Sequence, residues 1–98
     1  MRGWYPIMLV RVPASLRRDG KARAINMDLP AGATLRSVFD EIDRWIPGSL
    51  EKMVKPDGRL HGYVNVYVNG VDVRFAGGLA TQVSEGDEIV ILPAISGG

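Results

Sequence analysis

The chain has 98 residues, of which 46% are apolar and 23% charged, and its formal net charge at pH 7 is +1. This balance is typical of one folded domain. It excludes a disordered chain and gives no strong electrostatic preference for nucleic acid or membrane surfaces. The chain contains no cysteine, which excludes disulfides, thiolate metal sites and a cysteine nucleophile.

The first predicted element is a strand over residues 6–12, which read PIMLVRV. Its nearly continuous apolar run indicates a strand that is covered on both faces. The apolar stretch from Trp4 to Val10 is too short to span a bilayer. Cleavage of this stretch as a signal peptide would remove the first predicted strand. We therefore do not assign a signal peptide and expect a cytoplasmic protein.

A hairpin is predicted next. Asp19 and Gly20 form a favoured turn pair, and residues 25–29, INMDL, alternate as in a half-buried strand. Five basic residues lie in this hairpin. We expect their side chains to be solvated, and binding to an acidic partner or to nucleic acid is the alternative. They are Arg11, Arg17, Arg18, Lys21 and Arg23.

One main helix is predicted from Leu35 to Ile46, because Thr34 is a good N-cap and apolar residues then recur along one stripe. Pro47 ends this helix. Residues 49–54 indicate one further short turn of helix. The stripe consists of Leu35, Val38, Phe39, Ile42 and Ile46.

A second hairpin is predicted from residues 63–75, YVNVYVNGVDVRF, because valines alternate with polar residues on either side of Asn69-Gly70. That pair favours a two-residue type I′ turn. Alternation groups Phe75 with the valines and thus predicts a core side chain, whereas Arg74 is predicted to be solvated. The last predicted strand covers residues 88–93, EIVILP, and its apolar run indicates a central strand that is covered on both faces.

The order of elements is β-β-α-β-β-β, which we assign to the α+β class. The simplest arrangement places the first and last strands side by side and parallel at the centre of a mixed sheet, with the main helix across one face. This is a β-grasp, or ubiquitin-like, fold. We expect one domain over residues 1–93 and a flexible C-terminal tail over residues 94–98.

The predicted tail, AISGG, is built almost entirely of small residues and ends on Gly97-Gly98. Glycine has no Cβ and follows backbone paths that are closed to other residues. Five extended residues reach about 17 Å. The tail is therefore suited to entering a narrow channel in another protein while the domain stays outside.

The last third of the chain, VNVYVNGVDVRFAGGLATQVSEGDEIVILPAISGG, resembles the ubiquitin-like sulfur carriers of the MoaD/ThiS family. The resemblance rests on VNG-DVRF, then GL-T, then GDEI-ILP, and finally GG, and it extends to the whole chain in the order of elements. Within the family, LHGYVNVYVNGVDVRFAGGLAT together with LPAISGG is most similar to the carrier for cysteine synthesis.

The resemblance implies a carrier and not an enzyme. An E1-like adenylyltransferase and sulfurtransferase, of the MoeB, ThiF or MoeZ kind, is implied to adenylate Gly98 with ATP and magnesium. A sulfur donor then converts the terminus to a thiocarboxylate, and an acceptor such as a cysteine-synthase-like enzyme takes the sulfur. No bound cofactor or metal, no nucleic acid or membrane partner, and a monomer in the free state are expected.

The predicted site residues fall into two groups. Gly97 and Gly98 form the sulfur-carrying terminus, and the resemblance implies that Phe75 is an apolar contact for a partner and not a core residue. We further predict partner contacts from Arg74, Ile95 and Ser96. The sole histidine, His61, is predicted to be structural, and Gly77-Gly78 to form a tight turn and not a phosphate loop.

Other functions remain open from the sequence. The same activated Gly98 could be joined to lysines of target proteins, as in a ubiquitin-like modifier, or the domain could be a plain binding module. The sulfur could also serve molybdopterin, thiamine or a secondary metabolite.

Overall fold

The computed structural model describes residues 8–16 and 23–93. The predicted Asp19-Gly20 turn and the predicted tail, residues 94–98, lie outside the described residues. The elements, in chain order, are β1 (Met8–Val12), η1 (Ala14–Leu16), β2 (Arg23–Met27), α1 (Leu35–Trp45), α2 (Ser49–Met53), β3 (Val64–Val68), β4 (Val71–Asp72), η2 (Val73–Phe75), η3 (Gly78–Ala80) and β5 (Glu88–Pro93), where η marks a 3₁₀ helix.

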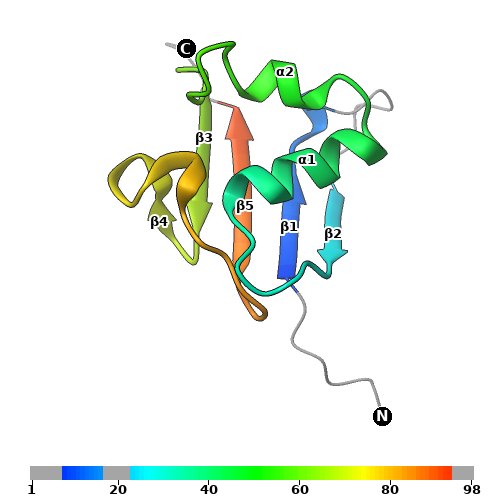
Figure 1. Ribbon diagram of the computed structural model, residues 1–98. Coiled ribbons are helices and arrows are strands. Elements are labelled where there is room, and N and C mark those ends of the chain that lie inside the picture. The colour runs from blue at the N-terminus through cyan, green and yellow to red at the C-terminus, as the bar shows by residue number, and fades with distance from the viewer. Residues whose placement is uncertain (1–7, 17–22, 94–98) are drawn as a thin grey trace.

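The strands form one mixed sheet in the order β2-β1-β5-β3-β4. The first and last strands are parallel neighbours, with Val10 opposite Ile89, and the other pairs are antiparallel. Helix α1 crosses one face of this sheet (Figure 1). These features confirm the α+β class and the predicted β-grasp arrangement, with β1 and β5 inside the sheet.

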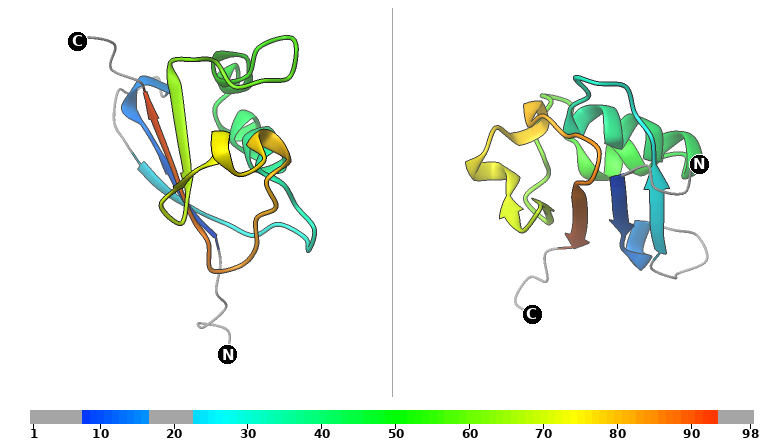
Figure 2. Two further views of the ribbon diagram at one scale, coloured as in Figure 1. Left: turned by 90° about the vertical axis from the view of Figure 1, so that its left-hand side faces the viewer. Right: turned by 90° about the horizontal axis from the view of Figure 1, so that it is seen from below.

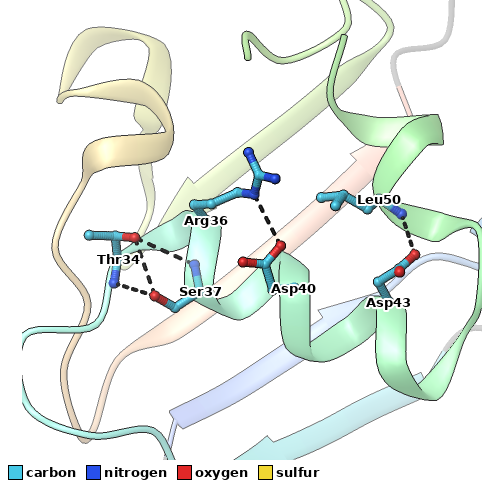
Figure 3. A network of polar contacts seen from close by, with 6 residues as sticks. All are labelled: Thr34, Arg36, Ser37, Asp40, Asp43 and Leu50. Carbon is cyan, nitrogen blue, oxygen red and sulfur yellow. Dashed lines mark hydrogen bonds and ion pairs between the residues drawn. The ribbon is translucent and has the colours of Figure 1, made fainter. Parts of the chain in front are cut away.

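Helix α1 begins where the sequence predicted. The Thr34 side chain accepts a hydrogen bond from the Ser37 backbone, and the Ser37 hydroxyl accepts one from the Thr34 backbone, which together form a capping box. Asp43 then ties the two helices together, because its Oδ1 accepts hydrogen bonds from the backbone N–H groups of Gly48 and Leu50 at 3.1 and 3.0 Å. Figure 3 shows the cap and the contact between Asp43 and Leu50.

The core lies between α1 and the inward face of the sheet. Phe39 and Ile42 of α1 are fully buried there, as are Val10, Val66 and Ile89 of the three inner strands. The predicted apolar stripe of α1 is thus the face that packs on the sheet. Trp45, beside that stripe, is instead 64% exposed.

The prediction that the first and last strands are covered on both faces was wrong. Their inward residues are buried, but Leu9 and Val90 are only half-buried and Leu92 is 45% exposed. The physical reason is that both α-helices pack on one side of the sheet, so neither covers the other side (left panel of Figure 2). The apolar runs therefore leave an apolar surface on the open face.

The second hairpin has the predicted turn. Asn69 and Gly70 both have positive φ values, 51° and 84°, as a type I′ turn requires. Strand β4 is only two residues long, because the chain turns into η2 at Val73. Among the described residues, no helix is long and apolar enough to cross a bilayer.

Candidate functional site

The chain leaves the domain from a firmly held strand. β5 pairs with β1 over Glu88–Val90 and with β3 through its last residue, Pro93, which lies opposite Val64. The predicted sulfur-carrying residues Gly97 and Gly98 lie outside the described residues, as do Ile95 and Ser96, so their roles stay predictions. The structure fixes the point from which they start.

An apolar pocket of about 360 Å³ lies beside this exit point. Tyr63 and Leu92 line it and are 54% and 45% exposed. Sequence reasoning missed both residues, although alternation places each one opposite in direction to a buried neighbour, Val64 or Ile91. The full lining is Pro13, Ser15, Lys52, Tyr63, Val64, Ile91, Leu92 and Pro93.

Phe75 is 88% exposed, so alternation gave the wrong prediction of a core side chain. The reason is local: alternation holds only while the chain is extended, and η2 begins at Val73. Val73 consequently turns fully inward, whereas Val71, on the short strand before it, is 55% exposed. An exposed phenylalanine is available to a partner, as the family resemblance implied.

Arg74 is held by the protein itself. Its Nη2 donates to the carbonyl oxygens of Val64 and His61 at 2.6 and 2.9 Å, and its Nη1 donates to Asn65 Oδ1 at 3.0 Å. Asp72 Oδ1 caps the same turn by accepting from the Arg74 backbone N–H at 2.9 Å. Arg74 is exposed, as predicted, but it lies in a 3₁₀ turn and not in a strand. Its side chain also clamps η2 to the start of β3.

We expect Arg74→Met to lower the free energy of unfolding by about 1–2 kcal/mol, because hydrogen bonds from a charged donor are worth roughly that much and methionine keeps only the stem. Arg44→Met is the control, since the Arg44 cation has a single exposed pair at 3.4 Å, with Glu41, and its loss should cost at most about 0.5 kcal/mol. Urea unfolding measures both. Equal effects would contradict the clamp.

The remaining candidates have structural roles. His61 stacks on Tyr63 with ring centroids 4.7 Å apart, and its Nε2 lies 3.3 Å from the Glu51 carbonyl oxygen. Gly77 and Gly78 both have positive φ values, which confirms the predicted tight turn. Over the described ranges 8–16 and 23–93, no cluster of His, Asp and Glu is arranged to hold a metal ion.

The adjacent carboxylates Asp87 and Glu88 both have partners within the domain. Glu88 forms an ion pair with Arg11 at 2.8 Å. Asp87 instead accepts hydrogen bonds from the Asn69 side chain and the Ser84 backbone. The two adjacent carboxylates thus have separate partners. Of the basic residues predicted in the first hairpin, Arg23 is exposed, and residues 17–22 lie outside the described part.

Comparison with known proteins gives a family match and two similar proteins. The ThiS family model matches residues 10–98. The sulfur carrier protein CysO of Mycobacterium tuberculosis is 40% identical over 92 residues, which cover 91% of this chain and 96% of that protein. A chain of the BexX/CysO complex of Amycolatopsis orientalis has a TM-score of 0.76 and 36% identity, and the match covers 93% of this chain and 99% of that one.

A relative with a different name has the same fold. The structure of small archaeal modifier protein 1 from Haloferax volcanii has a TM-score of 0.71 and 28% identity, and the match covers 93% of this chain and 98% of that one. The fold is therefore shared by proteins named as sulfur carriers and by one named as a modifier.

Proposed function

The chain belongs to the ThiS family, and from this membership we propose that it carries sulfur as a thiocarboxylate at Gly98 for a biosynthetic pathway. A family member of this kind is a small carrier and not an enzyme. The catalytic groups belong to the partners that load and unload it.

The proposed loading has two steps. A carboxylate oxygen of Gly98 attacks the α-phosphorus of magnesium-bound ATP in an E1-like partner, forming an acyl adenylate and releasing pyrophosphate. The sulfur of a bisulfide donor then attacks the carbonyl carbon, AMP leaves with the bonding electrons, and the donor's proton passes to solvent. The product is a thiocarboxylate, whose nucleophilic sulfur an acceptor enzyme can use.

One observation carries the proposal: the family match extends to Gly98. The strand before the last five residues, β5, is hydrogen-bonded to a neighbouring strand on each side. A strand paired in this way holds its last residue, Pro93, in a fixed position relative to any partner that binds the domain. Five residues beyond Pro93 reach at most about 17 Å. This suits a terminus that works inside a partner while the domain remains outside it.

Cysteine synthesis is the pathway we propose first, because the resemblance to CysO covers nearly the full length of both chains. Molybdopterin, thiamine or secondary-metabolite synthesis are the alternatives. The Amycolatopsis CysO was crystallised with BexX, which supports the idea that a CysO-like domain docks on a partner enzyme.

A ubiquitin-like modifier is the second candidate function, favoured by the fold shared with small archaeal modifier protein 1. Immunoblots of cell extract against this chain separate the two. Carriage predicts one small species, whereas conjugation to lysines predicts a ladder of heavier species that survives thiol treatment. A dominant ladder would overturn carriage as the main function.

We expect Phe75→Ala to raise the KM of the adenylating partner for the carrier by about tenfold or more, because an aromatic residue that acts as an interface hot spot contributes about 2 kcal/mol or more. Trp45→Ala is the control, since Trp45 is an exposed aromatic on α1. ATP–pyrophosphate exchange measures both. If the two variants behave alike, Phe75 is not a partner contact.

A further inference from the structure

A cleft of about 630 Å³ lies between the loop that follows α2 and the turn that contains η2 and η3. Both segments lie on the helix side of the sheet, as the left panel of Figure 2 shows, so this cleft is separate from the open face. The residues that line it are Lys55, Gly58, Arg59, Leu60, Arg74, Gly77, Gly78, Leu79 and Ala80.

The charged side chains that line this cleft are all basic: Lys55, Arg59 and Arg74. Within the described residues, no carboxylate lies within ion-pair distance of Lys55 or Arg74, and Arg74 binds only neutral acceptors through its side chain. Arg59 has one partner, Asp57, at 3.5 Å, and its side chain is 79% exposed. The cleft therefore keeps a net positive charge.

Asp72 caps the turn that carries the cleft-lining Arg74, and a second carboxylate, Asp57, directly precedes the cleft-lining Gly58. Its Oδ1 accepts a hydrogen bond from the Arg59 backbone N–H at 3.0 Å, and this bond lowers the pKa of Asp57 below its usual value. The carboxylate therefore stays ionised and partly offsets the charge of Arg59. Removing it should make the cleft more attractive to an anion, a change opposite in sign to the loss of a cation.

The walls of the cleft suit a peptide better than a single small anion. The cations come from two separate segments, and Leu60 and Leu79 add apolar surface between them. Phe75 follows the cleft-lining Arg74 in the sequence and is exposed, but it is not part of the lining. Gly77 and Gly78 add backbone without side chains, and the positive φ of each favours glycine.

We propose that this basic cleft binds a carboxylate-rich segment of the adenylating partner, an inference that rests on the proposed function. Arg74 links the cleft to the exit of the chain, since the carbonyl that it binds belongs to Val64, the residue opposite Pro93. An acidic segment in the cleft thus holds the partner beside the point where residues 94–98 begin. Attraction across such a contact raises the association rate and fixes the docked orientation.

The test is ATP–pyrophosphate exchange by the cognate adenylating enzyme, with KM for the carrier measured over a range of NaCl concentrations. Lys55→Glu and Arg59→Glu should each raise KM by about tenfold at low salt, with kcat at saturation unchanged, and should flatten its salt dependence. Asp57→Asn should lower KM, since it removes a competing charge and keeps the oxygen that accepts from Arg59. Arg44→Glu, the control with the same charge change on α1, should stay within about twofold.

The outcomes separate the two proposals. If the wild-type chain supports no exchange, the proposed function fails and the cleft assignment fails with it. If the wild type is active but Lys55→Glu and Arg59→Glu match Arg44→Glu, only the cleft assignment fails. Inorganic phosphate that competes with the wild type but not with Arg59→Glu would mark a phosphate site and overturn the peptide assignment. Thermal melts confirm folding, and the exposed Arg59 carries the test if Lys55→Glu does not fold.

Discussion

Deletion of Gly98 is expected to abolish sulfur uptake and to leave the stability of the domain unchanged. The shortened chain presents its carboxylate about 3.5 Å further back, whereas a misplacement of reacting atoms by about 1 Å can cost roughly 100-fold in rate. The missing residue lies beyond β5, which ends at Pro93, so the core keeps its packing. The measurement is intact mass after incubation with the adenylating partner, magnesium-ATP and sodium sulfide.

A chain extended by one residue past Gly98 is the complementary variant, because it moves the free carboxylate outward by a similar distance. It should also take up no sulfur until a protease removes the added residue. Urea unfolding of both variants checks that the domain is intact. Sulfur uptake by the deletion variant at the wild-type rate would contradict the assignment of Gly98 as the reacting residue.

The second large expected effect is on stability, and it differs between the two phenylalanines of the chain. Phe39 is fully buried between α1 and the sheet, whereas Phe75 is 88% exposed. Phe39→Ala should therefore lower the free energy of unfolding by about 3–5 kcal/mol, a large part of the roughly 5–15 kcal/mol of a typical domain. Phe75→Ala should change it by no more than about 0.5 kcal/mol.

Urea unfolding of the two variants at one temperature provides the comparison, because both remove the same atoms from the chain. If Phe75→Ala were as destabilising as Phe39→Ala, the result would indicate that Phe75 is a core residue, as alternation along an extended strand had predicted. It would also remove the basis for treating Phe75 as a partner contact.

Much of the fold followed from local patterns that tertiary packing did not override. The stripe of α1 and the cap at Thr34 set the helix, and Asn69-Gly70 set the second hairpin, where both residues have the positive φ of a type I′ turn. The apolar runs of the first and last strands correctly placed them inside the sheet. The assumption behind this placement, that both faces of each strand are buried, was only half right, because one face of each strand is open.

The error at Phe75 has a local cause: sequence patterns describe regular elements and do not show where an element stops. At Val73 the chain changes from a strand to a 3₁₀ turn, which reverses the direction predicted for Phe75. The clamp by Arg74 joins residues nine to thirteen positions apart, and the basic cleft joins Lys55 to Gly78. Such contacts depend on tertiary geometry, which periodicity along the chain does not contain.

The most direct test of the central claim is a mass measurement on the wild-type chain ending at Gly98. After incubation with the adenylating partner, magnesium-ATP and sodium sulfide, the intact mass should rise by the difference between one sulfur and one oxygen atom. Fragmentation should place that difference on Gly98. An unchanged mass in the presence of an enzyme that is shown to adenylate the chain, or a sulfur located elsewhere, would contradict thiocarboxylate carriage.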